Sequence, residues 1–160
     1  MEKTKVIAIK DWQSHGKTTT LWLLLKALLE EGAKVNEIWD LNNNREIEIP
    51  EEMPPLGELE GIDYWAVIEW HNLVIVLDSR GDYAGYLESD LKCALEMCPD
   101  YIICAIQMRP INRDIWNAFN RACPNTSYQR VCFWTDLAEN PIDAEKVKQP
   151  TVEAIMKYIA

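Results

Sequence analysis

The pattern of apolar and polar positions predicts two kinds of element that alternate along most of the chain. Short apolar runs are typical of buried strands, and they occur at 6–9, 35–40, 64–70, 73–77, 101–106 and 130–134. Apolar residues spaced three or four apart predict helices over 17–31, 87–98, 111–122 and 152–159. Because strands and helices alternate, we expect an α/β fold of three layers, α/β/α, with a mainly parallel sheet.

One pair of predicted strands departs from this alternation. Only His71 and Asn72 separate the runs 64–70 and 73–77, a spacing that allows a β-hairpin. The sheet is therefore expected to be mainly parallel, with one antiparallel hairpin strand as the alternative. The first run alternates in polarity and the second is continuously apolar, so the second is expected nearer the sheet centre.

Residues 42–63 differ in kind from the rest of the chain. The stretch opens with three asparagines, contains three prolines, and carries many more acidic than basic side chains. This composition predicts a long acidic surface loop. With 160 residues and 48% hydrophobic content, the chain is expected to form a single domain over 1–160 that includes this loop.

Charge and apolar run lengths exclude several classes of function. The formal net charge of −10 argues against direct binding to nucleic acid, because the overall field repels phosphate backbones. No apolar segment is long enough for a signal peptide or a membrane span, so we expect no membrane span and a cytoplasmic protein. The five cysteines are odd in number and lie mostly in apolar runs, as expected of reduced core thiols.

The segment between the first predicted strand and the first helix carries the clearest chemistry. Residues 11–18, Asp-Trp-Gln-Ser-His-Gly-Lys-Thr, match the phosphate-binding pattern G-x-x-x-x-G-K-[ST] except that Asp11 replaces the first glycine. Gly16 allows close approach of the backbone to phosphate, Lys17 can reach the outer phosphates, and the Thr18 hydroxyl can ligate Mg²⁺. The candidate phosphate-binding residues here are Gln13, Ser14, His15, Gly16, Lys17, Thr18 and Thr19.

Two aspartates end predicted strands and are candidate partners of this loop. Asp78 follows an apolar run, where a carboxylate can hold Mg²⁺ or a water bound to it. The spacing Asp78-Ser-Arg-Gly81 resembles a γ-phosphate-sensing switch in which Gly81 presents its N–H group. Arg80 is the basic residue best placed by sequence to stabilise charge in phosphoryl transfer. Asp40, at the end of the second strand, is the weaker candidate, and its alternative role is a turn cap before Asn42.

These motifs give the chain a resemblance to the P-loop NTPase superfamily with a degenerate Walker A loop. Gly16-Lys-Thr-Thr-Thr20, followed by a leucine-rich helix that ends near Gly32, is most similar to the partitioning and MinD-type ATPases and the molybdopterin-dinucleotide accessory GTPases. The extra lysine of that branch falls at Trp12 and is missing. The resemblance implies ATP or GTP as ligand, Mg²⁺ as cofactor, a role for Asp40 near the attacking water, and a homodimer or a protein partner.

The sequence thus leaves three functions open. The first is a switch or ATPase that binds a nucleoside triphosphate with Mg²⁺ and hydrolyses it slowly, with Lys17, Asp78 and Asp40 as catalytic residues. ATP is favoured because the guanine motif N-K-x-D is absent. The second is a small-molecule phosphotransferase, and the third is a non-catalytic interaction module on the same type of fold.

Overall fold

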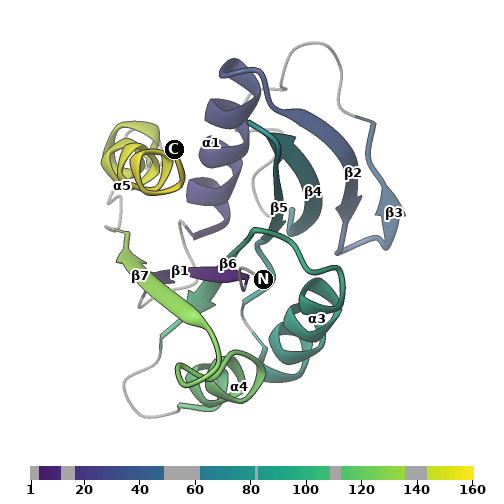
Figure 1. The fold of residues 1–160 in the computed structure, drawn as a ribbon, viewed down its shortest axis with the longest axis vertical. Helices are drawn as coiled ribbons and strands as arrows, with labels where there is room; N and C mark the ends of the chain where they lie inside the picture. Colours follow the sequence, from purple (N-terminus) through teal and green to yellow (C-terminus); the bar gives the residue numbers. More distant parts are fainter. Residues whose placement is uncertain (1–3, 12–16, 49–61, 82, 109–112, 136–143) are drawn as a thin grey trace.

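The chain folds around one mixed β-sheet with helices on both faces (Figure 1). The computed structural model describes residues 4–11, 17–48, 62–81, 83–108, 113–135 and 144–160. The seven strands lie in the order β3 (Arg45–Glu46), β2 (Lys34–Asp40), β4 (Tyr64–Trp70), β5 (Leu73–Asp78), β6 (Tyr101–Gln107), β1 (Lys5–Asp11) and β7 (Gln129–Trp134).

The sheet contradicts the expected fold class, a mainly parallel three-layer sheet of the P-loop NTPase type. Of the six strand pairings, β5–β6, β6–β1 and β1–β7 are parallel, whereas β3–β2, β2–β4 and β4–β5 are antiparallel. The physical reason lies in the connections. A parallel pair needs a long crossover, but two residues join β4 to β5, and a connection that short permits only antiparallel pairing.

The turn between β4 and β5 has the backbone conformation that a tight hairpin requires. His71 and Asn72 have φ angles of 49° and 64°. Positive φ at both central residues is the signature of a type I′ turn, whose twist matches that of the flanking strands. The hairpin expected at these residues is therefore present, and β5, its second strand, lies at the centre of the sheet order.

Four helices within the described residues cover the two faces of the sheet. One face packs against α1 (Lys17–Glu30) and α5 (Ala144–Ile159), and the other against α3 (Ala84–Glu96) and α4 (Asp114–Ala122) (Figure 1). Along β1, Ile7 and Ile9 face the first pair of helices while Val6 and Ala8 face the second, as the alternation of a strand requires. Because β1 is apolar on both faces, it is buried in the middle of the molecule.

Among the described residues, we find no helix with the length and apolarity needed to cross a membrane.

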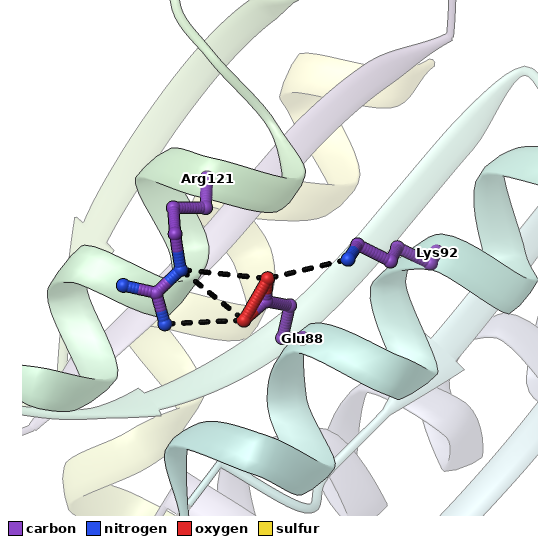
Figure 2. A network of polar contacts seen from close by, with 3 residues as sticks. All are labelled: Glu88, Lys92 and Arg121. Atoms are coloured by element: carbon purple, nitrogen blue, oxygen red, sulfur yellow. Dashed lines mark hydrogen bonds and ion pairs between the residues drawn. The ribbon is translucent and has the colours of Figure 1, made fainter.

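The second helical layer is joined by a polar contact as well as by its apolar core. Glu88 of α3 accepts hydrogen bonds from Arg121 of α4, the shortest at 3.1 Å, and pairs with Lys92 one turn further along α3 at 3.3 Å (Figure 2). Beneath this contact Leu87, Leu91 and Phe119 are fully buried. The two helices of this layer therefore meet through both apolar and polar contacts.

Candidate functional site

The chain leaves two neighbouring parallel strands toward opposite faces of the sheet. From β1 it continues to α1 on one face, and from the adjacent strand β6 it continues to α4 on the other (Figure 1). The last residues of the two strands, Asp11 and Gln107, are register partners. Such a point, where the connections diverge, opens a crevice at the carboxyl ends of the strands, and ligands of α/β proteins bind there preferentially.

The start of α1 is fixed to this edge of the sheet. Helix α1 begins at Lys17. One turn into it, the buried hydroxyl of Thr20 shares a hydrogen bond of 3.1 Å with the hydroxyl of Thr135, which follows β7. Thr135 in turn donates its backbone N–H to the carbonyl of Lys10 in β1, at 3.1 Å. The amino terminus of α1 is thereby held beside the ends of β1 and β7.

The candidate phosphate-binding residues are only partly within the described structure. Gln13, Ser14, His15 and Gly16 lie outside the described residues. Lys17 and Thr18 form the first residues of α1, and Thr19 is half-buried in the same turn. The strand and the helix on either side of the candidate loop are therefore in the predicted order, and the contacts of the loop itself stay a prediction.

Asp78 ends β5 as a fully buried carboxylate with one unsatisfied oxygen. Its Oδ1 accepts the backbone N–H of Arg80 at 3.1 Å. Its Oδ2 is buried and accepts no hydrogen bond from the described residues. A buried carboxylate oxygen without a donor is costly, so this atom is suited to bind a proton, a cation or a donor from a ligand.

The electrostatics of Asp78 follow from its burial and from a second acid. Burial raises the pKa of Asp78 well above its usual value, and the nearby Asp90 carboxyl raises it further, while Arg80 opposes both effects. Asp90 lies on α3 and holds the Arg80 guanidinium through two hydrogen bonds, of 2.8 and 3.2 Å. The protonated form of Asp78 can share its proton with Asp90, and the ionised form cannot.

The register of β5 directs Asp78 to one particular face of the sheet. Ile75 and Leu77 belong to the core beneath α1 and α5, whereas Val76 belongs to the core beneath α3 and α4. Side chains alternate along a strand, so Asp78 shares the face of Val76, in agreement with its contact to Asp90 on α3. Asp78 thus lies on the face opposite the helix that contains Thr18. Joint ligation of one magnesium ion by these two residues stays a prediction, and it requires the ion to lie over the edge of the sheet.

Gly81 is buried against the end of β6. Its carbonyl accepts the N–H of Gln107 at 3.1 Å, and its own N–H donates to the Ser79 carbonyl at 3.0 Å. A Cβ atom at Gly81 would lie 1.7 Å from the carbonyl oxygen of Ala105, so only glycine fits at this position. The N–H group expected to meet a γ-phosphate is thus bonded within the chain here, and that role would require the segment to rearrange.

Asp40 occupies a different kind of place. Its Oδ1 accepts the N–H groups of Asn42 and Asn43, at 3.0 and 3.1 Å, and its Oδ2 accepts the Asn43 amide at 2.8 Å. Burial favours a higher pKa for Asp40, but these hydrogen bonds, with a contribution from Arg45, lower it on balance. Strands β4, β5 and β6 separate it from β1, a distance of about 19 Å at the usual strand spacing. The side chain acts as the cap of the turn, the alternative the sequence had left open.

Two residues that the sequence did not single out belong to the cluster around Asp78. Asp90 falls on the buried stripe of α3, between Leu87 and Ala94. An acidic residue on an otherwise apolar stripe is the signal that could have revealed it. Ser79 is buried as well, and its hydroxyl accepts the Tyr64 N–H at 2.8 Å, which fixes the chain beyond β5.

Among the described residues, histidine, cysteine, aspartate and glutamate form no group of three or more that could hold a metal ion.

No protein-family model, no curated protein and no solved structure matched this chain in the comparisons. The fold and the site define an α/β protein with a mixed sheet in which the connections that follow β1 and β6 diverge to opposite faces. The family resemblance of the sequence stays a prediction.

Proposed function

We propose that this protein binds the phosphates of a nucleoside triphosphate, with Mg²⁺, at the edge where β1 and β6 diverge. The observation that carries the proposal is the coincidence of two independent features. The sequence Gly16-Lys-Thr18 falls at the start of α1, and α1 starts beside the switch point of the sheet. A helix amino terminus presents N–H groups and positive potential, which favour phosphate, and Lys17 adds a full charge.

The ligand would be ATP in preference to GTP, because the chain lacks the N-K-x-D guanine motif. The Mg²⁺ ion would bind as a complex with the triphosphate, and the hydroxyl of Thr18 would be its ligand from the protein. The unsatisfied Oδ2 of Asp78 fits a second contact, through water, once the carboxyl group is ionised. Because burial raises the pKa of Asp78, ionising its carboxyl group costs free energy, and the charge of the cation must offset that cost.

Within this proposal, hydrolysis is slow and serves a switch. Arg80, the basic residue nearest Asp78 in sequence, is held by Asp90 rather than directed to the edge of the sheet. Asp40 is engaged in its own turn. With these side chains so engaged, water attack relies on Lys17, the ion and the backbone N–H groups.

Thermal unfolding with and without nucleotide tests the proposal. ATP with Mg²⁺ at about a hundredfold excess over its Kd should raise the Tm by roughly 5 °C or more. Lys17→Ala should abolish the rise, because it removes the charge that meets the outer phosphates. Lys34→Ala is the matched control, since Lys34 is an exposed lysine at the opposite end of the sheet. An unchanged Tm of the wild type with both ATP and GTP would refute the proposal.

A non-catalytic module is the second candidate, and a specific observation favours it. Asp78 faces α3, and Asp90 binds the guanidinium of its neighbour Arg80, so this basic side chain is engaged within the fold and not by a ligand. Phosphate release separates the two candidates. Slow release that Lys17→Ala removes supports the switch, whereas nucleotide binding with no release supports the module. Transfer to an added small-molecule acceptor instead of water would identify a phosphotransferase.

A further inference from the structure

Among the described residues, the two most exposed large hydrophobic side chains are two tyrosines at the start of α3. Tyr83 is 65% exposed and Tyr86 is 53% exposed. Their rings meet edge to face, with centroids 5.9 Å apart and planes at 88°. Large apolar side chains are normally covered, and an exposed cluster of them is typical of a binding surface.

The tyrosine pair is built onto the cluster around Asp78. The Arg80 guanidinium lies 4.3 Å from the centroid of the Tyr86 ring, and Asp90 fixes the guanidinium from the other side. Tyr86 is thereby held in place by a buried carboxylate through an arginine. An aromatic ring held in this way loses little conformational freedom when a ligand binds.

The side chain of Tyr83 does not cap the helix that follows it. Tyr83 is the N-cap residue of α3, yet its side chain makes no capping hydrogen bond. Small polar residues are preferred at such a position, because their side chains can accept an N–H of the first turn.

The kind of ligand follows from the charge next to the rings. The Arg80 guanidinium already occupies the cation position over Tyr86. The ring that remains most exposed, Tyr83, is suited to a planar, uncharged aromatic ring, which stacks on its face. The pair lies beyond the end of β5, and only β6 separates β5 from β1, so the ends of these two strands are about 10 Å apart at the usual strand spacing. Helices α3 and α1 cover opposite faces of the sheet, so a nucleotide that reaches both the pair and the start of α1 must pass over the edge of the sheet.

We propose that Tyr83 and Tyr86 form a platform on which a nucleobase stacks. This inference deepens the proposed function and rests on it for the phosphate site, but the platform itself can be tested alone. The base has two possible sources, the nucleoside triphosphate bound at α1 or a second nucleoside or nucleotide. Stacking on a ring face discriminates poorly between bases, so the platform itself should add no preference between adenine and guanine.

Equilibrium binding with probes that contain or lack a base distinguishes the two sources. The probes are magnesium tripolyphosphate, MgATP and MgGTP, followed by adenosine or thymidine added to protein saturated with MgATP. If the platform holds the base of the triphosphate, Tyr83→Ala should weaken MgATP and MgGTP about tenfold and leave tripolyphosphate unchanged. If it holds a second base, the same change should leave MgATP unchanged and weaken the added nucleoside about tenfold.

Controls separate stacking from damage to the fold. Tyr83→Phe keeps the ring and should bind as the wild type does. Met97→Ala changes another exposed apolar side chain, at the far end of α3, and should have no effect. Because Tyr83 caps no backbone group, Tyr83→Ala should retain the helix, and an unchanged far-ultraviolet circular dichroism spectrum checks this.

Ring signals provide a readout that does not depend on the phosphate site. In protein labelled with ¹³C on tyrosine rings, adenosine monophosphate should shift the Tyr83 and Tyr86 resonances. Such shifts in a protein that fails to bind tripolyphosphate would refute the proposed function and leave the platform intact. Two results together would overturn the platform. Tyr83→Ala would weaken the binding of neither MgATP nor the added nucleosides, and no base would shift the tyrosine resonances.

Discussion

Strands β5 and β2 each end in a buried aspartate, and the surroundings of the two side chains differ sharply. Asp40, at the end of β2, has donors for both carboxylate oxygens within its own turn. Asp78, at the end of β5, has a buried oxygen with no donor among the described residues, and a second acid nearby. Hydrogen bonds lower the pKa of the first carboxyl group, whereas burial raises that of the second.

The difference shows which half of the sheet has a buried polar group without a hydrogen-bond donor among the described residues. In the antiparallel half, local turns satisfy the polar groups at the strand ends. In the parallel half, the chain leaves each strand for a helix, so the groups at the strand ends depend on residues distant in sequence, such as Asp90 for Asp78. An unsatisfied buried group that stabilises nothing by itself is more informative about function than a well-capped one.

The largest expected effect comes from the backbone beyond Asp78. Gly81→Ala places a Cβ 1.7 Å from the Ala105 carbonyl oxygen, and backbone must move to relieve the clash. We expect a loss of about 3 kcal/mol in the free energy of unfolding, measured by urea titration. Gly85→Ala is the matched control, since its Cβ would meet nothing within 4 Å. Equal stability of the two variants would show that the end of β5 is not tightly packed.

The next effect concerns the charge of Asp78 and depends on pH. A raised pKa means that the folded state holds the proton more tightly than the unfolded chain does. This stabilisation is complete below the ordinary pKa of aspartate and is lost as the pH rises through the raised value. Asp78→Asn remains neutral and can donate to Asp90, so above that value it should be more stable than the wild type by about 2 kcal/mol.

The measurement for Asp78→Asn is urea unfolding of both proteins across the pH range, with a chelator present to remove divalent cations. The difference in stability should grow with pH. A variant that is less stable than the wild type at alkaline pH would mean that the ionised carboxylate is well satisfied, and the contrast with Asp40 would then disappear.

The smallest effect is expected at Asp40 and has the opposite dependence on pH. Its lowered pKa contributes stability that is present above the ordinary pKa of aspartate, near 3.8, and is lost as the pH falls through the lower folded value. Asp40→Ala removes the cap of the turn and should cost about 1 kcal/mol at neutral pH. In acid the two proteins should become equally stable. Loss of nucleotide binding in this variant would instead restore a functional role for Asp40.

The elements themselves could be predicted closely from the sequence, because apolar periodicity is a local property. Helix α1 was expected at 17–31 and spans Lys17–Glu30, with Gly32 at a φ of 91° just after it. The hairpin turn at His71 and Asn72 was equally local. The terminal helix was expected only over its apolar stripe, 152–159, whereas α5 begins at Ala144. The first half of α5 was missed because it carries few apolar residues.

The pairing of strands and the surroundings of the candidate site could not be predicted in this way. The mainly parallel sheet was wrong because β2 also pairs antiparallel with β4, a strand distant in sequence, and strand periodicity does not encode that choice. The same limit applies to Asp78 and Asp40. Both follow apolar runs and look alike in sequence, and they differ only in what packs around them.

The sequence by itself determined the periodic elements, the Gly-Lys-Thr at the start of α1 and the acidic character of the chain, since each depends on residues close together in the chain. Only the tertiary structure decided that Asp78 faces α3, that Asp90 holds Arg80, and that two exposed tyrosines lie beside them. These contacts join strand ends to a helix from the next part of the chain. Burial and hydrogen bonding across such contacts are properties of the folded sheet, and local pattern does not specify them.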